Sequence, residues 1–595
     1  MGLEYLQSNL TGGELAPTLH ARTDIDKYNT ALAEAENVVI VPQGGLRRRP
    51  GLAKHITIGE DARLEPFIFN KSQQYLLVFK AGFIDIVRDG VVVKADLVSP
   101  YTTMDIVDGI DIIQSADTVI MTYEDIAPQR LVRGATDVDW TIDAIPLTIP
   151  NNDFGSGNEP VWSATRGYPI SCCFHMGRLW FGGSTSKPTS VWGSRVNGFF
   201  DFTWVETSGV VPDDHAIFDT IESGQYNKIT NIFSARGLQV FTTGSEFFNT
   251  VDIITPANSA WEAQTGYGSK GLRPIFIDGA TLFVDSSSRN IREFVYSFDE
   301  DSYVSNSITL LASHLLTDIK AIAAIKGTTL DISDFVYVVN SDGSLAVMNT
   351  LRNESILGWT HWTTQGEFLD VCVVDKEVFF LVKRMGEYFI ETVDENSYTD
   401  HSVVISGTEP ITDNVTHLSD NVVFDLTQNV IYTDTSTGTP VDTITTDYDP
   451  VFNDTEFKVI ADYSMQDDTV PTVTAPGENT FTITREAYRL EVGLDYNTKI
   501  VTLPIGGSLK SGSTLHRRKR VVKVEMNIYE SLGVYARNIY AADRQFTVAL
   551  DEAPEPFTGF KELYLLGYTR LTQIEITQIN PLPMLIRGIG YEIEY

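Results

Sequence analysis

The sequence predicts an all-β protein: a β-propeller of about seven blades, some with loop insertions, joined to C-terminal domains of β-sandwich or barrel-like type. The main observation is a motif that occurs seven times: a hydrophobic β-run, a turn rich in Gly, Asp, Ser, Asn or Lys, and a second β-run. Successive copies begin 43 to 60 residues apart, and one propeller blade takes roughly 40–45 residues. The 31 Phe and 25 Tyr residues also suit strands with half-buried faces.

The copies of the motif cover residues 75–87, 118–132, 178–194, 238–251, 281–295, 335–349 and 378–393. Where the interval exceeds the length of one blade, we expect a loop insertion. Residues 149–169 are rich in Gly, Asn and Pro and are too polar for a blade strand. They predict a protruding gate or docking loop, whose candidate contact residues are Asn151, Asn152, Asp153, Phe154, Glu159 and Trp162.

Four regions are expected along the chain. Residues 1–61 form an N-terminal arm and strand that packs on the propeller or on a neighbour, and residues 62–395 form the propeller. Residues 396–515 form an acidic β domain rich in Thr and Asp, since residues 394–468 contain 16 Asp and Glu against one Lys. Residues 516–595 form a last β unit, in which apolar and polar residues alternate as in a strand.

Two local patterns refine this division. Residues 27–37 have a helical pattern, and residues 38–41 that of a strand. Residues 314–325 fit either a short helix or an alternating strand, and propeller geometry favours the strand.

The composition limits the classes of function. The net charge of −35 argues against a protein that grips nucleic acid by neutralising phosphates. It is compatible with a surface that DNA slides past, and equally with plain solubility. Three Cys residues do not make a disulfide framework. We expect neither a transmembrane helix nor a secretion signal.

Only two basic runs stand out in this acidic chain. They are Arg47, Arg48 and Arg49 in the first region, and Arg517, Arg518, Lys519 and Arg520 in the last. Such runs are usually solvated faces or partners in salt bridges, and phosphate contact is a third alternative. In so acidic a chain they also fit acidic patches on other subunits. We therefore take them as candidate contacts between subunits or with an adaptor protein.

The sequence contains no pattern typical of a known catalytic or metal site. It lacks HExxH, GxSxG and the phosphate-binding GxxxxGK[ST]. With 79 Asp and Glu residues, spacing cannot single out a pair of catalytic carboxylates. We expect no catalytic residue, no cofactor and no metal, and hence no enzyme.

Four segments resemble the tail nozzle protein family of short-tailed, T7-like bacteriophages (podovirus-like), also called tail tubular protein B. They are the opening NLTGGELAPTLHARTDIDKYNTALAEAENVVIVPQGGLRRRPG, FHMGRLWFGGSTSKPTSVWGSRVNGFFDFTW, FTTGSEFFNT, and the end from RRKRVVKVEMNIYESLGVYARN to NPLPMLIRGIGYEIEY. Each motif alone is weak, but their order and spacing together are moderately specific.

The resemblance implies a structural virion protein in the phage tail, made in the host cytoplasm. It would form a hexamer at the distal end of the DNA-ejection channel and gate this channel before ejection. The implied partners are the tail adaptor ring above, tail fibres or spikes, and the host cell surface or outer membrane. Double-stranded DNA would pass through without sequence-specific binding.

Two alternatives come from other classes of protein. A propeller-bearing tailspike would bind glycans or cleave them as a depolymerase, and it predicts a carboxylate pair in a pocket on one propeller face. A cellular adhesion or scaffold propeller is disfavoured, because the blades carry no WD-type signature and no secretion signal is expected.

Overall fold

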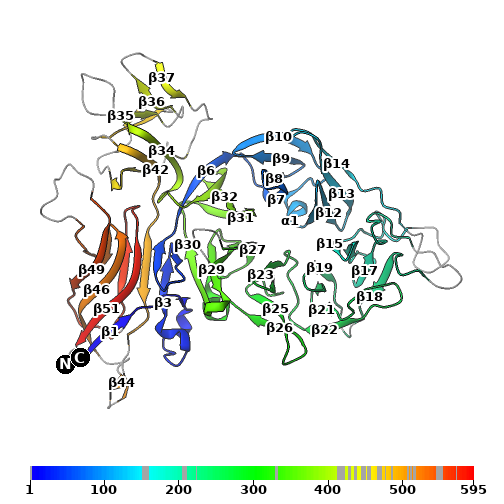
Figure 1. The fold of residues 1–595 in the computed structure, drawn as a ribbon, viewed down its shortest axis with the longest axis horizontal. Helices are drawn as coiled ribbons and strands as arrows, with labels where there is room; N and C mark the ends of the chain where they lie inside the picture. Colours follow the sequence, from blue (N-terminus) through cyan, green and yellow to red (C-terminus); the bar gives the residue numbers. More distant parts are fainter. Residues whose placement is uncertain are drawn as a thin grey trace.

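Seven four-stranded antiparallel units follow one another around a ring (Figure 1). The computed structural model describes residues 3–149, 160–203, 211–222, 224, 226–327, 333–411, 422–425, 430–434, 439–443, 451, 457–465, 472–475, 478–483, 487–505, 508–509, 512–513, 518–543, 554–570 and 572–594. Each unit is one blade of a β-propeller. The propeller predicted from the repeated motif is confirmed.

Blades one to three account for the first part of the ring. Blade one contains β7 (Arg63–Asn70), β8 (Gln73–Lys80), β9 (Phe83–Arg88) and β10 (Val91–Val98). Blade two contains β11 (Asp111–Ser115), β12 (Thr118–Tyr123), β13 (Ile126–Arg133) and β14 (Trp140–Ala144), preceded by helix α1 (Met104–Asp108). Blade three contains β15 (Ser171–His175), β16 (Arg178–Gly182), β17 (Ser190–Gly193) and β18 (Ile217–Thr220).

Blades four to six continue the ring. Blade four contains β19 (Ile229–Ser234), β20 (Leu238–Thr242), β21 (Glu246–Asn249) and β22 (Trp261–Thr265). Blade five contains β23 (Ile275–Ile277), β24 (Ala280–Val284), β25 (Ile291–Ser297) and β26 (Ser302–Ser307). Blade six contains β27 (Ile319–Ile325), β28 (Asp334–Asn340), β29 (Leu345–Leu351) and β30 (Ile356–Trp362), with the short 3₁₀ helices η3 (Leu310–Leu315) and η4 (Arg352–Glu354) beside it.

Blade seven is built from both ends of the propeller segment. It contains β31 (Glu367–Val374), β32 (Glu377–Arg384) and β33 (Glu387–Asp394), and its outer strand is β6 (Gly51–Thr57). Strand β6 pairs antiparallel with β33, from Gly51 opposite Asp394 to Thr57 opposite Phe389. The ring is therefore closed by hydrogen bonds between segments more than 300 residues apart in the chain.

In every blade, the repeated motif corresponds to the second and third strands. These strands are apolar because neighbouring blades cover both of their faces: all five residues of β16 and of β20 are buried. An outer strand such as β10 buries little of its surface, and Val91 and Val98 are exposed in it. Such a strand therefore lacks the apolar pattern by which a strand is recognised in the sequence.

The two ends of the chain form one β-sandwich on the outer edge of the ring (Figure 1). One sheet contains β1 (Leu3–Gln7), β4 (Val38–Ile40), β5 (Leu46–Arg48), β46 (Arg520–Ser531), β49 (Phe557–Tyr564) and β51 (Leu585–Glu594). The other contains β2 (Gly13–Glu14), β3 (Ala31–Glu36), β43 (Thr498–Thr502), β47 (Val534–Ala536), β48 (Ile539–Tyr540) and β50 (Glu575–Gln578). The 3₁₀ helices η1 (Pro17–Leu19) and η2 (Asp26–Asn29) connect β2 to β3.

The regions expected at residues 1–61 and 516–595 thus share one hydrophobic core. Leu32, Ile40, Ile500, Val524 and Ile589 are buried together in it. The helix expected over residues 27–37 is wrong beyond η2, since β3 occupies residues 31–36. Pairing of β3 with β43 and burial of its alanines override the helical propensity of Ala, Leu and Glu.

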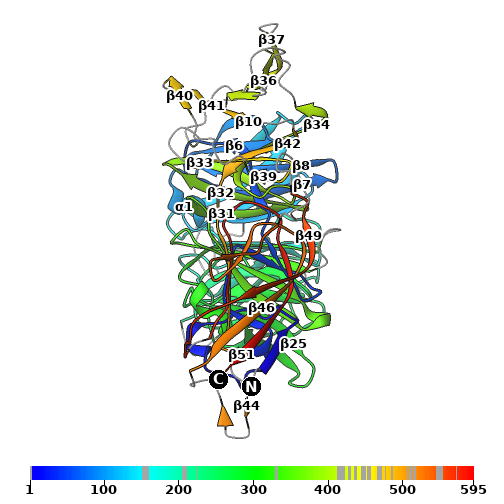
Figure 2. The same ribbon diagram turned by 90° about the vertical axis from the view of Figure 1, so that its left-hand side faces the viewer.

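An inserted module extends the sheet of blade seven outward. Strand β34 (Asp400–Ile411) runs parallel to β6 and leads to β42 (Ala487–Leu494), β38 (Lys458–Ala461) and β39 (Ser464–Met465). A separate sheet contains β35 (Val422–Asp425), β36 (Val430–Asp434), β37 (Thr439–Thr443), β40 (Thr472–Ala475) and β41 (Glu478–Ile483). Seen from the side, β36 and β37 lie at one end of the molecule, and the termini and the hairpin β44–β45 (Ser508–Leu509, Gly512–Ser513) at the other (Figure 2).

Glu14 joins the N-terminal strands to blade six. Its carboxylate lies 2.7 Å from His314 Nε2 and 2.9 Å from His361 Nδ1, and it accepts a hydrogen bond from the Ala35 N–H. Burial alone would raise the pKa of Glu14, but the two histidines and this N–H lower it to about 2. Burial also lowers the pKa of His361, but Glu14 outweighs this effect and the net pKa is raised.

This contact predicts a pH-dependent contribution to stability. The pKa of His361 is higher in the folded state, so its contribution is complete below the unfolded histidine pKa of about 6.5 and is lost as pH rises through the folded value. We expect the difference in melting temperature between the wild type and His361→Gln to shrink from pH 6 to pH 9. Differential scanning calorimetry across this range measures it, and a constant difference would contradict the assignment.

Candidate functional site

The first basic run lies at the junction of the propeller, the sandwich and the inserted module. Arg47 is half-buried and its Nη1 is 2.7 Å from Glu395 Oε2. Arg48 is buried and donates from Nη1 to Thr498 Oγ1 and Gln578 Oε1, at 3.1 Å each. Arg49 is completely buried. The expected contact of Arg48 and Arg49 with another subunit does not fit this burial, because the chain's own residues surround both guanidinium groups.

Arg49 makes the central interaction of this junction. Its Nη1 and Nη2 donate to Asp400 Oδ1 and Oδ2 at 2.8 and 2.6 Å, and its guanidinium carbon lies 3.5 Å from the centre of the Tyr496 ring. Asp400 begins strand β34, Tyr496 follows β42, and Arg49 precedes β6. Arg49 therefore fixes the base of the inserted module against blade seven and the sandwich.

A second buried pair supports the same base. Arg384 Nε and Nη2 donate to the two oxygens of Glu391 at 2.7 Å each, and His401 Nδ1 lies 2.8 Å from Glu391 Oε1. Burial would raise the pKa of Glu391, but Arg384 and His401 lower it to about 2. The carboxylate therefore remains charged at any physiological pH, and the network is a permanent structural joint.

The second basic run is divided among different environments. Arg517 lies outside the described residues, and Arg518 is exposed. Lys519 is buried and donates from Nζ to the Ile505 carbonyl, so it does not fit an outward contact. Arg520 pairs with Glu594 at 2.9 Å on the surface of the sandwich. In this run, Arg518 and Arg520 are the described residues that a partner could reach.

Most of the expected gate loop cannot be placed. Asn151, Asn152, Asp153, Phe154 and Glu159 lie outside the described residues. Trp162 is only 2% exposed, and its ring packs edge-on against Trp192, Phe181 and Phe202 with centroids 5.2 to 5.5 Å apart. It belongs to the core of blade three, so its expected role as an exposed docking residue is wrong.

The propeller encloses a cavity of about 780 Å³ around its axis. Its walls are residues at or near the starts of the innermost strands, such as Arg63, Asp111, Ile229 and Lys320, together with Thr243 and Ser341 from turns between second and third strands. It therefore lies at the end of the channel where the innermost strands begin. Cavities of roughly 300–1,000 Å³ are typical of small-molecule sites.

Hydrogen bonds between blades shape the wall of this cavity. Asp370 Oδ2 accepts from the Leu64 N–H at 2.6 Å, Asp111 Oδ2 accepts from the Cys172 N–H at 2.9 Å, and Ser171 Oγ accepts from the Ile232 N–H at 2.8 Å. Each contact joins the innermost strand of one blade to that of the next. The polar groups of the cavity are therefore held on a rigid frame.

Five basic and four acidic side chains line the cavity, although the whole chain has 44 basic and 79 acidic residues. The basic residues are Arg63, Lys228, Lys270, Arg273 and Lys320, and the acidic ones are Glu65, Asp108, Asp111 and Asp370. Arg63 pairs with Glu65 at 2.5 Å, and Arg273 Nη1 lies 2.5 Å from Asp111 Oδ1. The local balance is thus opposite to that of the chain.

Two carboxyl groups of the cavity have raised pKa values. Burial raises the pKa of Asp370 to about 7, although the N–H groups of Leu64 and Val371 oppose this. Burial also raises the pKa of Asp108, and Lys320 and Arg63 oppose it. Perturbed groups in a cavity mark a candidate binding site.

Sequence reasoning did not find these residues. They come from separate blades, and only ring closure brings them together. The available signal is a charged residue at the start of an innermost strand, where an apolar residue is expected, as with Arg63, Asp111 and Lys320.

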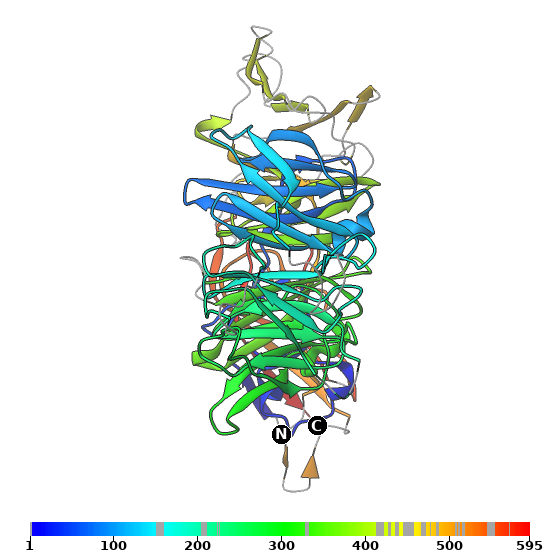
Figure 3. The ribbon, with the colours of Figure 1, turned by 90° about the vertical axis from the view of Figure 1, so that its right-hand side faces the viewer.

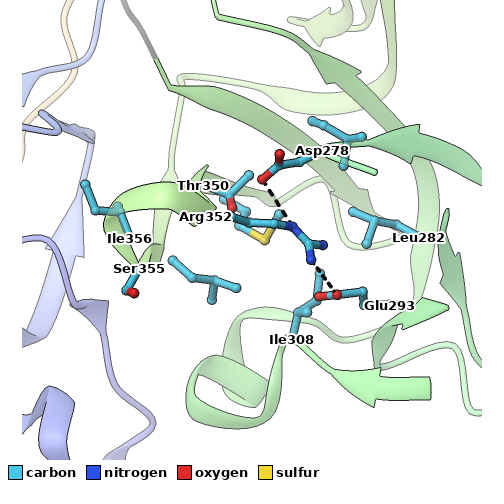
Figure 4. A pocket seen from close by; sticks show the side chains of 11 residues that line it. Asp278, Leu282, Glu293, Ile308, Thr350, Arg352, Ser355 and Ile356 are labelled. Carbon is cyan, nitrogen blue, oxygen red and sulfur yellow. Dashed lines mark ion pairs between the residues drawn. The ribbon is translucent and has the colours of Figure 1, made fainter. Parts of the chain in front are cut away.

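A smaller cavity of about 290 Å³ lies between blades five and six (Figure 4). Arg352 spans its opening and pairs with Asp278 at 3.1 Å and Glu293 at 2.8 Å. Apolar side chains such as Leu282 and Ile308 form the interior. Because Arg352 is paired with two carboxylates, the lining of this cavity offers no unpaired cation to an anionic ligand.

Within the described part of the chain, no three His, Cys, Asp or Glu side chains gather in a way that could hold a metal ion. The same part contains no helix with the length and apolar character needed to cross a membrane. Cys172, Cys173 and Cys372 are buried with free thiols.

No protein-family model matches the chain, and no curated protein matches it. Among solved structures, it is similar to BBS1N in complex with ARL6DN, with a TM-score of 0.35 and 8% identity over 59% of this chain and 99% of that chain. It is also similar to the Pan2 WD40 domain of Neurospora crassa, with a TM-score of 0.32 and 10% identity over 59% of this chain and 96% of that chain.

Proposed function

We propose that this protein is a non-enzymatic tail nozzle subunit of a short-tailed bacteriophage. In this role, six copies surround the distal end of the DNA-ejection channel below an adaptor ring, and they gate it before ejection. The observation that carries the proposal is the sandwich: the two segments near the chain ends that resemble the nozzle family pair directly, with Leu46 opposite Ile586 and Arg47 opposite Leu585.

The shape and charge of the chain support a ring. The propeller, the sandwich and the inserted module lie side by side in Figure 1, and the two edge-on views show that the body is flat (Figures 2 and 3). A flat subunit can pack against copies of itself around an axis, and such a ring needs heterologous contacts between different faces. Because the propeller cavity is only about 780 Å³, duplex DNA would pass along the axis of the ring, where the net charge of −35 per chain opposes adhesion.

The oligomeric state of the purified protein tests this proposal. We expect light scattering to give about six times the 66.1 kDa chain mass, and averaged electron micrographs to show a ring. Its central hole should be about 20–30 Å wide, since a duplex with a ~12 Å major groove must pass. A monomer in solution, together with no ring of this protein in isolated tails, would refute the proposal.

A glycan-binding or depolymerase tailspike is the second candidate, and one observation favours it. The propeller cavity contains Asp370, whose pKa is raised by burial to about 7, together with the ion-paired carboxylates Asp111 and Glu65. Glycosidases use two carboxyl groups, one of them an acid with a raised pKa. The assay is reducing-end release from capsular polysaccharide, with Asp370→Asn as the test variant. Cleavage that Asp370→Asn abolishes would favour this candidate over the nozzle.

A further inference from the structure

We propose that the propeller cavity binds a small molecule through an oxyanion group, a carboxylate or a phosphate, held by Arg273 and Lys320. This site is separate from the proposed assembly into a ring and does not depend on it. The proposal rests on the five cationic side chains of the cavity: some already have their partners within the protein, and others keep donors that are unused.

Three of the five cavity cations are satisfied by the protein. Arg63 donates from Nε and Nη2 to Glu65 Oε1, and from Nη1 to the carbonyls of Val107, Asp108 and Ile110. Lys228 is 2.7 Å from Glu124, and Lys270 is 2.7 Å from Asp318. Each of these three cations is thus already paired with a carboxylate of the protein.

Arg273 is only partly used. Its Nη1 contacts Asp111, whereas its Nε and Nη2 have no partner among the described residues, and its side chain keeps 29% of its surface exposed. Nε and Nη2 form the edge of a guanidinium that matches the two oxygens of a carboxylate or phosphate. Asp111 also accepts from Ser171 Oγ and from the Cys172 N–H, so the guanidinium is held in a fixed orientation.

Lys320 is the second available cation. It lines the same cavity from β27 of blade six, and none of the described residues forms an ion pair or a side-chain hydrogen bond with it. Asp108 is near enough for the charge of Lys320 to lower its pKa, but the two form no ion pair. An oxyanion would accept hydrogen bonds from Nε and Nη2 of Arg273 and would neutralise the charge of Lys320.

The rest of the cavity indicates what kind of molecule carries the oxyanion. Apolar side chains of Ile170, Ile229, Leu272, Ile275 and Ile322 cover much of the wall and suit a carbon skeleton. Asp108 lines the same cavity, and its carboxyl group can accept a hydrogen bond from a hydroxyl group. A hydroxylated acid such as a sugar acid matches both features.

Isothermal titration calorimetry of the purified full-length protein tests the site, with glucuronate, inorganic phosphate and glucose as probes. We expect glucuronate and phosphate to bind, glucose not to bind, and added salt to weaken binding. Tighter binding of glucuronate than of phosphate would assign a role to the hydroxyl groups. The reverse order would assign the site to phosphate, still as an oxyanion site.

Three variants locate the binding. Lys320→Gln and Arg273→Lys should each weaken glucuronate by about tenfold or more, the loss expected for one charged contact. Arg273→Lys keeps a cation beside Asp111, so it tests the guanidinium edge without leaving that carboxylate unpaired. Lys376→Gln, an exposed lysine in the turn between β31 and β32, is the matched control and should bind as the wild type does.

Two results would overturn the proposal. One is the absence of binding tighter than about 1 mM for either oxyanion. The other is binding that neither Lys320→Gln nor Arg273→Lys changes. Both readouts are independent of oligomeric state, so a failed ring and a failed cavity site are distinguishable.

Discussion

Arg49→Ala should lower the free energy of unfolding by about 3–5 kcal/mol, because it leaves the buried carboxylate of Asp400 without its partner. Both side chains have no exposed surface. The substitution also removes the stacking on Tyr496 and the hydrogen bond to Asn37 Oδ1. Urea unfolding, followed by tryptophan fluorescence, measures this decrease in the free energy of unfolding from the first unfolding transition.

Arg47→Ala is the matched control for this prediction. Its pair with Glu395 is partly exposed, and such pairs contribute about 0–1 kcal/mol. The double variant Arg49→Met/Asp400→Leu should recover much of the loss, since neither partner of the pair is then left as an unpaired buried charge. If Arg49→Ala costs no more than Arg47→Ala, the junction does not hold the inserted module in the way described.

Trp162→Ala should cost about 3–5 kcal/mol, the range for removing a large aromatic side chain from a core. The ring of Trp162 fills space between Trp192, Phe181 and Phe202 in blade three. A residue of an exposed gate loop would change stability little on the same substitution. The melting temperature of the purified variant therefore separates a core role from a gate role.

Two further variants complete this test. Trp162→Phe keeps an aromatic ring and removes an indole N–H that has no acceptor among the described residues, so we expect a loss below about 1.5 kcal/mol. Phe298→Ala changes a side chain that is 88% exposed and should stay within about 0.5 kcal/mol of the wild type. Equal losses of unfolding free energy for Trp162→Ala and Phe298→Ala would support a position of Trp162 in an exposed gate loop.

The seven-fold repeat was readable in the sequence for a physical reason. The second and third strands of each blade are covered on both faces, so their residues are apolar almost without interruption, as in Tyr75–Lys80. Outer strands such as β22, in which Glu262 and Ala263 are exposed, carry no such signal. A propeller of about seven blades could therefore be predicted, whereas the exact number and the outer strand that completes the last blade could not.

The basic runs show the limit of local reasoning about sites. Three successive arginines suggest a surface that meets a partner. In the fold, Arg48 and Arg49 are instead buried. They donate hydrogen bonds to Thr498, Gln578 and Asp400, which are more than 300 residues away in the sequence. Burial of a charge depends on such distant partners, and no local pattern reports them.

The sequence by itself determined the all-β class, a propeller of about seven blades and the acidic character of the segment that follows it, because alternation, turn residues and charge are local properties of the chain. Only the tertiary structure decided that β6 closes blade seven, that the two ends form one sandwich, and that Arg273 and Lys320 face the same cavity. These features depend on contacts between residues far apart in the chain. The free energy that stabilises these features comes from strand pairing and burial that exist only once the ring has closed.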